Sequence, residues 1–219
     1  MGIAAPDQVN RAVYWTQFPA HALSGTDWSD HANAHASIMR LFPARLDGPP
    51  QERRSTAGVL YRVDAHPDQC PTVLIQSLVS PELTPAPAQT LTVPSRAWDM
   101  PAGTPVAFRV TVCPIRRHNP PKGHPGKERT TPVPDDELDT WVTSKISPAF
   151  TDVKILNTMT HATLARPGQG RACPPRVALA TVDGVAVITD PDTHTLLRVQ
   201  GVGRAKAYGA GLLTTRPLT

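Results

Sequence analysis

The segment GVLYRVDAHPDQCPTVLIQSLVS (58–80) decides the fold class. Its two ends, 58–64 and 72–80, are rich in β-branched and large apolar residues, whereas the stretch between them, 65–71, is polar and contains two prolines. Apolar runs of this length that are separated by turn-forming residues predict two β-strands joined by a polar turn.

The segments before this pair predict a further strand and a helix. Residues 12–19 (AVYWTQFP) predict a first strand that stops at its proline. Residues 31–42 (HANAHASIMRLF) predict an amphipathic helix that ends at Pro43. Three residues are candidates for its N-cap: Asp27, Ser29 and Asp30.

The segments after the pair complete a recognisable order. Residues 81–103 are interrupted by prolines and predict a short helix at most. Residues 104–113 (TPVAFRVTVC) alternate between apolar and other residues and predict a fourth strand. The resulting order, β-α-β-β-(α)-β, is the ferredoxin-like arrangement.

The second half of the chain follows the same pattern less regularly. A loop over 115–131 precedes a predicted helix over 135–146, and residues 152–164 are extended but poorly patterned. Residues 176–190 (RVALATVDGVAVITD) predict a hairpin that turns at the pair Asp183-Gly184.

A short helix over 191–200 and a strand over 210–217 end the pattern. The sequence therefore predicts an α+β protein with two tandem ferredoxin-like (RRM-like) domains, 1–113 and 114–219, of which the C-terminal one is less regular.

Composition narrows the classes of protein that fit. The 219 residues include 25 prolines, which disfavours an all-helical bundle, and three cysteines, which disfavours a disulfide framework or a cysteine-rich zinc site. The N-terminus has no apolar signal-peptide region, and no run approaches the 18 apolar residues that a membrane span requires. We expect a cytoplasmic protein in a reducing compartment.

Positive charge is concentrated in two segments. The net charge is +4, but residues 115–131 hold five Lys or Arg and one acid, while residues 193–219 hold four Lys or Arg and no acid. The remainder of the chain is therefore acidic. Two basic segments on an acidic body indicate binding to a polyanion such as nucleic acid. The alternative for either segment alone is a solvated basic loop.

One of these segments contains the glycine-rich stretch GVGRAKAYGAGLL (201–213). It lacks the Ser or Thr that a nucleotide P-loop requires after Lys206, and Lys206 occupies the third glycine position of a dinucleotide-binding motif. Exposed backbone N–H groups beside Arg204 and Lys206 suit a sugar–phosphate backbone. The alternative is a structural turn between a helix and a strand.

His31 and His35 are the candidates for acid–base chemistry. They lie four residues apart on one helix face, the spacing of a zinc pair, but Ala32 stands where a zinc hydrolase has its catalytic glutamate. The helical periodicity places His31 within the apolar arc, which favours a partly buried structural residue. His35 lies at the margin of that arc, where an acid–base group can reach a ligand.

Five blocks together resemble one family. HASIMRLFP (35–43), GVLYRVD, TVLIQSLVSP, TPVAFRVTVCPIRR and GVGRAKAYGAGLL follow, in order, the pattern of the CasE-type CRISPR repeat endoribonucleases. These are the crRNA-processing subunits of the type I-E Cascade complex, in the RAMP superfamily. The resemblance implies two ferredoxin-like domains that bind the CRISPR repeat stem-loop, cut it without metal or cofactor, and remain bound to the product together with other Cascade subunits.

The resemblance also implies roles for particular residues. The catalytic histidine of the family matches His35, and the family's tyrosine position holds Ala32. The second catalytic group is then expected to be His31, Lys206 or Tyr208. We expect RNA contacts from nine residues: Arg116, Arg117, Lys122, Lys127, Arg129, Gly203, Arg204, Tyr208 and Gly209.

Metal-free RNA cleavage uses the ribose 2′-hydroxyl as nucleophile, so it requires a base, an acid and a cation near the phosphorane. Histidine suits the first two roles because its ordinary pKa of about 6.5 lies near working pH. Lys206, Arg204 and the N–H groups of the loop suit the third. Two competing functions remain: a non-cleaving RNA-binding subunit of the same complex, and a zinc hydrolase built on His31 and His35.

Overall fold

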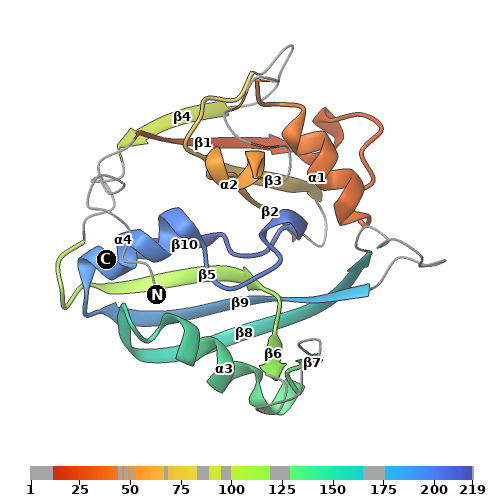
Figure 1. The fold of residues 1–219 in the computed structure, drawn as a ribbon. Helices are drawn as coiled ribbons and strands as arrows, with labels where there is room; N and C mark the ends of the chain where they lie inside the picture. The colour runs from red at the N-terminus through yellow and green to blue at the C-terminus, as the bar shows by residue number, and fades with distance from the viewer. Residues whose placement is uncertain are drawn as a thin grey trace.

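A computed structural model of the protein describes residues 12–43, 46, 49, 52–66, 69–82, 89–94, 100–118, 129–164 and 176–218. Two antiparallel sheets, one from each half of the chain, lie one above the other (Figure 1). No helix in these ranges is long and apolar enough to cross a membrane.

The first sheet contains the strands β1 (Ala12–Pro19), β2 (Leu60–His66), β3 (Gln69–Ser77) and β4 (Gln89–Pro94). Its spatial order is β2-β3-β1-β4 and every neighbouring pair is antiparallel. This is the ferredoxin-like order. The strands predicted over 12–19, 58–64 and 72–80 are confirmed as β1, β2 and β3, with shifts of a few residues at their ends.

The described residues of this half form three helical segments: η2 (Ala20–Ala22), α1 (His31–Met39) and α2 (Arg53–Thr56). Of the three candidate caps, Asp30 begins α1, because its side chain accepts hydrogen bonds from the backbone N–H groups of Ala32 and Asn33. The apolar face of α1 packs on the sheet through Ile38, which is fully buried.

The second sheet contains β5 (Pro105–Val112), β8 (Phe150–Leu164), β9 (Arg176–Ile188) and β10 (Leu213–Pro217), in the order β10-β5-β9-β8. In chain order this is again the ferredoxin-like arrangement. The lesser regularity expected of this half takes the form of two register shifts in β8 and an added hairpin of β6 (Ile115–His118) and β7 (Arg129–Pro132).

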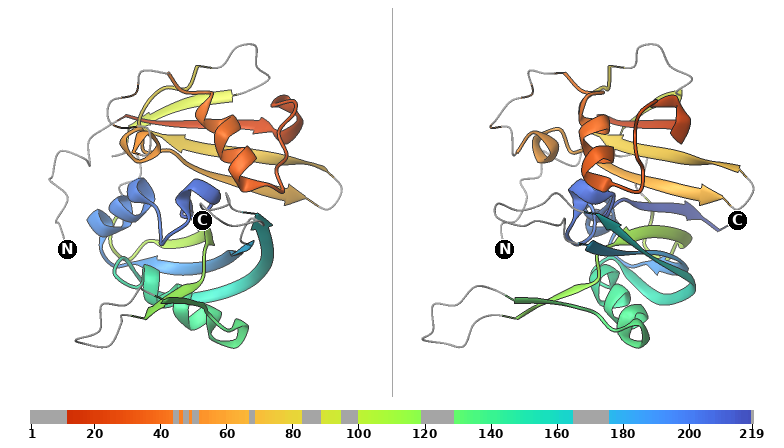
Figure 2. Two further views of the ribbon diagram at one scale, coloured as in Figure 1. Left: turned by 45° about the vertical axis from the view of Figure 1, so that its right-hand side comes forward. Right: turned by 90° about the vertical axis from the view of Figure 1, so that its right-hand side faces the viewer.

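The helical segments of the second half are η4 (Asp135–Glu137), α3 (Leu138–Ile146), α4 (Pro191–Gln200) and η5 (Lys206–Tyr208). The helices predicted over 135–146 and 191–200 are thereby confirmed. Figures 1 and 2 show α4 and the glycine-rich loop between the two sheets, with α3 on the outer side of the second sheet.

The placement of 104–113 as the fourth strand of the first half is wrong. β5 pairs with β9 and β10 of the second sheet, and the first sheet is completed by β4, in the segment that was expected to hold a short helix at most. The chain therefore passes from one sheet to the other between Pro94 and Pro105, before the expected division at residue 113.

The hairpin predicted at Asp183-Gly184 is also wrong, because both residues lie inside the continuous strand β9. Asp183 accepts two hydrogen bonds from Arg109 on β5, at 2.6 and 2.9 Å. Gly184 makes room for the Phe108 ring, since a Cβ atom there would lie 2.6 Å from Phe108 Cζ. An Asp-Gly pair usually forms a turn, but here Asp183 forms an ion pair with the neighbouring strand and Gly184 allows an aromatic ring to pack on the sheet.

Buried polar contacts join the two halves. Arg62 of β2 is 5% exposed, and its Nε donates to Asp64 at 2.8 Å. Its Nη1 reaches into the second sheet, where it donates to Thr214 Oγ1 at 3.2 Å and to the carbonyl of Arg109 at 3.4 Å. Gln76 of β3 donates to the Arg198 carbonyl of α4 at 2.8 Å.

Candidate functional site

Helix α1 packs directly on η5 of the glycine-rich loop, and its His31 lies against that loop. His31 is 7% exposed and His35 is partly buried. Gly209 has a φ of +82°, and a Cβ atom at this position would lie 3.2 Å from the His31 ring. Two motifs that are far apart in the sequence therefore meet, and a glycine is required where they meet.

His31 faces a residue that the sequence analysis did not single out. The ring of His161, on β8, stacks on the His31 ring with centroids 6.5 Å apart. Burial lowers the pKa of His31, and the backbone of Tyr208 opposes this by a hydrogen bond. A histidine with a lowered pKa is neutral at pH 7 and can accept a proton. His161 lies in the segment with poor patterning, which gave no signal for it.

A cleft of about 360 Å³ opens beside this stack. His31 and His161 line it together with Gly209 and two arginines, Arg62 and Arg109. Since these residues come from both sheets and from the loop, the cleft exists only where the two halves meet.

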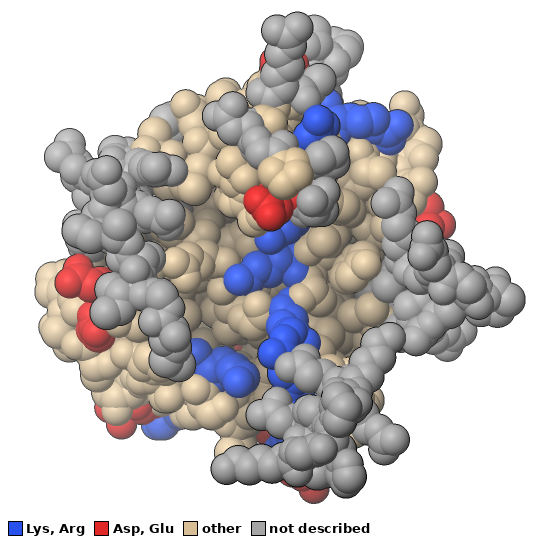
Figure 3. Space-filling model, in the orientation of Figure 1, with Lys and Arg blue, Asp and Glu red and all other residues tan. Residues whose placement is uncertain are grey.

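The two basic segments of the sequence meet at a second pocket, of about 520 Å³, which we call the basic pocket. Arg116 and Arg117 of β6 line it from one side, and Gly203 and Arg204 of the loop line it from the other. Lys145 of α3 also lines it. Figure 3 shows Lys and Arg side chains following one another down the middle of this face. Such a row of cations suits an extended polyanion.

The glycine-rich loop has a fixed shape. Gly201, Gly203, Gly209 and Gly211 all have positive φ. The Val202 N–H donates to the Gly211 carbonyl at 2.8 Å, and the Gly211 N–H donates to Thr111 of β5 at 2.6 Å. The loop is therefore closed on itself and tied to the second sheet. The loop is thus a structural turn between a helix and a strand. This is compatible with a binding role, because a rigid turn can also present a binding surface.

The remaining predicted site residues are distributed as follows. Tyr208 is partly buried in η5, next to His31. Lys206 lines a third pocket, which shares no lining residue with the cleft of His31. Lys122 and Lys127 lie outside the described residues, as does the side chain of Arg129. Within the described ranges, no three His, Cys, Asp or Glu side chains come together as metal ligands.

Comparison with known proteins gives a consistent result. The family model described as "CRISPR associated protein" matches residues 10–217. No curated protein sequence matches significantly. Among solved structures, Cas6e from Escherichia coli K-12 is similar, with 23% identity and a TM-score of 0.61.

Two further structures share this fold. The CRISPR endoribonuclease Cse3 bound to a 19-nucleotide RNA has 22% identity and a TM-score of 0.64. A CRISPR RNA-guided surveillance complex contains a chain with 18% identity and a TM-score of 0.64. Each of the three alignments covers 94% of this chain and 100% of the other.

Proposed function

The chain belongs to the CRISPR-associated protein family, and from this premise we propose that it binds the stem-loop of CRISPR repeat RNA and cuts the RNA at the 3′ base of the stem. The observation that carries the proposal is that His31 of α1 and the basic pocket meet at one rigid glycine-rich loop. The product then stays bound, and the protein acts as a subunit of a Cascade-type complex.

The proposed chemistry is an internal transesterification. The 2′-hydroxyl loses its proton to a base and attacks the adjacent phosphorus, while an acid protonates the departing 5′-oxygen. The products are a 2′,3′-cyclic phosphate and a 5′-hydroxyl, and no metal takes part. Histidine fits both proton-transfer roles, and each typically contributes 10²–10⁴-fold to the rate.

We assign the two proton transfers to His35 and His31. CasE-type proteins often have a tyrosine at the position of Ala32, and alanine cannot supply its hydroxyl group. His31 lies on the same helix face, one turn from His35. Burial lowers the pKa of His31, which favours the role of proton acceptor. His35 then donates to the leaving oxygen. Positive charge from Arg204 and Lys206, on either side of the loop, stabilises the charge on the phosphorane.

The stem-loop itself is held by the basic pocket. Figure 2 shows the β6–β7 hairpin extending away from the body of the second half. Arg116 and Arg117 lie on this hairpin and are exposed. Exposed arginines on a projecting ribbon can follow the backbone of an RNA duplex, which is recognised mostly by its shape and phosphates.

The test uses the repeat RNA of the source genome, mixed with the protein in EDTA. We expect cleavage of unmodified RNA to a cyclic phosphate and no cleavage of a matched RNA with one 2′-deoxy nucleotide at the cut. Equal cleavage of both RNAs would rule out the 2′-hydroxyl mechanism.

A second candidate is an RNA-binding subunit that does not cleave. Ala32 favours this candidate, because CasE-type proteins often have a tyrosine at that position and this chain does not. In the same experiment this candidate predicts tight binding of both RNAs without any cut. Metal analysis of the purified protein addresses the zinc alternative, which predicts a bound stoichiometric zinc ion.

A further inference from the structure

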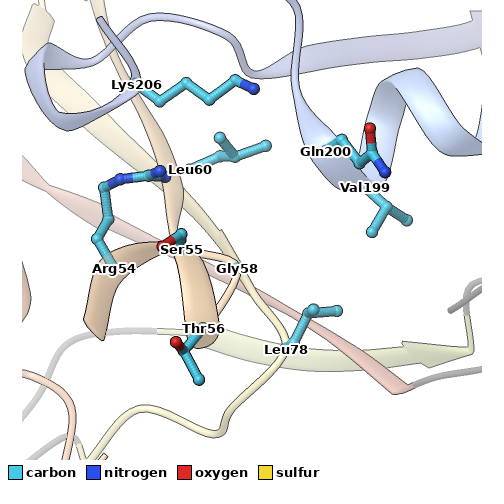
Figure 4. A pocket seen from close by; sticks show the side chains of 9 residues that line it. All are labelled: Arg54, Ser55, Thr56, Gly58, Leu60, Leu78, Val199, Gln200 and Lys206. Atoms are coloured by element: carbon cyan, nitrogen blue, oxygen red, sulfur yellow. The ribbon is translucent and has the colours of Figure 1, made fainter. Parts of the chain in front are cut away.

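A pocket of about 460 Å³ lies between α2, α4 and the glycine-rich loop (Figure 4). Arg54 of α2 and Lys206 of η5 reach into this space from different elements. Ser55, Thr56 and Gln200 add polar groups to the lining. The rest of the wall consists of Gly58 and three apolar side chains, Leu60, Leu78 and Val199.

Both cations line the same pocket, and its described lining residues include no acidic side chain. Both are partly buried. Burial lowers the pKa of Lys206, and the charge of Arg54 lowers it further. Like charges that share a partly desolvated pocket repel each other, so an anion between them would remove an unfavourable interaction.

The Arg54 side chain is held in position for such an anion. Its Nη1 donates to the Val59 carbonyl at 2.9 Å, which fixes the guanidinium at the start of β2. The guanidinium carries further N–H donors in a planar fork that matches phosphate. The Ser55 hydroxyl already donates to the Glu52 carbonyl at 2.7 Å, so the donors for the anion come from Arg54 and Lys206.

The position of the pocket relates it to the cleavage site. Lys206 lines this pocket, whereas Gly209, just beyond η5, contacts His31 in the cleft. No residue lines both cavities, so we treat them as two separate sites. A single strand that crosses the loop would place two different phosphates in them.

We propose that the pocket of Arg54 and Lys206 binds an RNA backbone phosphate near the cut, distinct from the phosphate that is attacked. This inference rests on the proposed function for the identity of the ligand, but the anion site itself does not. Lys206 then acts by fixing the strand beside the histidines as well as by lending charge to the reaction.

The first experiment uses inorganic phosphate alone and measures the unfolding temperature. Phosphate should raise it in the wild type and raise it much less in Arg54→Met, because a ligand stabilises only the state that binds it. Arg53→Met is the matched control: it removes the same charge from the same helix, and Arg53 does not line the pocket. Equal rises in all three proteins would overturn the anion site.

The readout is the rise with phosphate, so a lower starting stability of Arg54→Met does not affect it. Should that variant fail to fold, Lys206→Met replaces it and the same suppression of the rise is expected.

The second experiment identifies the ligand. Repeat RNAs that carry one neutral methylphosphonate at successive positions near the cut are bound to wild type and to Arg54→Met. One position other than the scissile phosphate should weaken wild-type binding about tenfold, the size of one charged hydrogen bond, and have no effect in the variant. If phosphate stabilises the protein but no position behaves this way, the site serves a free phosphate compound and the RNA proposal is wrong.

The two proposals can fail separately. Failure of the wild type to cleave any repeat RNA would contradict the proposed function and leave the phosphate result standing. Normal cleavage with no difference between wild type and Arg54→Met in either experiment would contradict the pocket alone.

Discussion

His31 at the start of α1 and His161 near the end of β8 stack face to face, with planes inclined by 22°. The stack joins the two halves of the chain at the cleft. Burial lowers the pKa of both rings, and the charge of His161 further lowers that of His31. Since protonating one ring disfavours protonating the other, the arrangement keeps His31 neutral at the pH where a base is needed.

His35→Ala should slow single-turnover cleavage by 10²–10⁴-fold, the contribution of one positioned acid–base group. Hairpin affinity should change little, because binding rests on many phosphate contacts. If His31 has replaced the missing tyrosine, His31→Ala should cost a similar factor. Rates and affinities of both variants provide the measurement. Cleavage by His35→Ala at the wild-type rate would contradict the assignment of His35 as a catalytic residue, whereas RNA binding without cleavage by the wild type would support the non-cleaving alternative.

Neutralising the basic pocket should weaken RNA binding and reduce its salt dependence. The triple variant Arg116→Ala, Arg117→Ala and Arg204→Ala removes three cations that line one pocket. The slope of log affinity against log salt should fall by about 0.7–0.9 for each phosphate that the protein no longer neutralises. Arg216→Ala, an exposed arginine on β10 that lines none of the pockets described above, is the control. An unchanged slope in the triple variant would contradict the assignment.

Two glycines of the loop should respond differently to valine. A Cβ atom at Gly203 meets nothing within 4 Å, so Gly203→Val costs mainly the strain of a positive φ, about 1–2 kcal/mol, and should impair RNA binding more than stability. A Cβ atom at Gly209 meets the His31 and Tyr61 rings at 3.2 Å, so Gly209→Val should also displace His31. Thermal unfolding, RNA affinity and cleavage rate separate these effects; complete unfolding of both variants would leave the loop as a turn only.

Gly184→Ala tests the reinterpretation of the Asp-Gly pair. A Cβ atom there would lie 2.6 Å from both Phe108 Cζ and the Lys154 carbonyl oxygen, so the substitution should destabilise the protein by about 1–3 kcal/mol. Gly25→Ala is the control: it introduces a positive-φ strain but meets no atom within 4 Å. Denaturant unfolding gives both values. A neutral effect at Gly184 would argue against a continuous β9.

Acid should destabilise the protein through His194. This residue is fully buried, and burial together with the charge of Arg198 lowers its pKa to about 4. Below pH 6.5 the unfolded chain binds a proton on this histidine and the folded chain does not. The free energy of unfolding is therefore unaffected by His194 above pH 6.5 and decreases as the pH falls toward 4. The decrease at pH 5 should be about 2 kcal/mol. His194→Gln should show a flatter pH dependence of unfolding; an identical dependence would contradict it.

Most elements were predictable because their signals are local. The N-caps of α1 and α4 and the apolar faces of α1, α3 and α4 depend on neighbouring residues in the sequence, as do the patterns of β1 and β3. β4 was missed because it is a proline-flanked strand that depends on long-range pairing with β1, such as Thr92 opposite Tyr14. Asp183-Gly184 was misassigned because Arg109 and Phe108, distant in the sequence, decide its conformation.

The site was predictable to a similar extent. The α1 histidines and the glycine-rich loop were each visible as motifs, and α1 contacts the loop in the fold through His31. His161 and Arg54 were not visible, because no spacing or neighbouring residue distinguishes them from other surface histidines and arginines. Only the packing of the two halves brings them to their cavities.

The Arg62 side chain has a consequence for how fast a ligand can be captured. Separating the halves would strip this buried guanidinium of its acceptors in the second sheet, a cost of several kcal/mol. The cleft between the halves is thus already assembled before any ligand arrives. Binding then requires no slow domain closure, because the entropy cost of fixing the two halves relative to each other is already part of the folding free energy. Association should be governed by electrostatic steering, with a rate constant that rises as ionic strength falls.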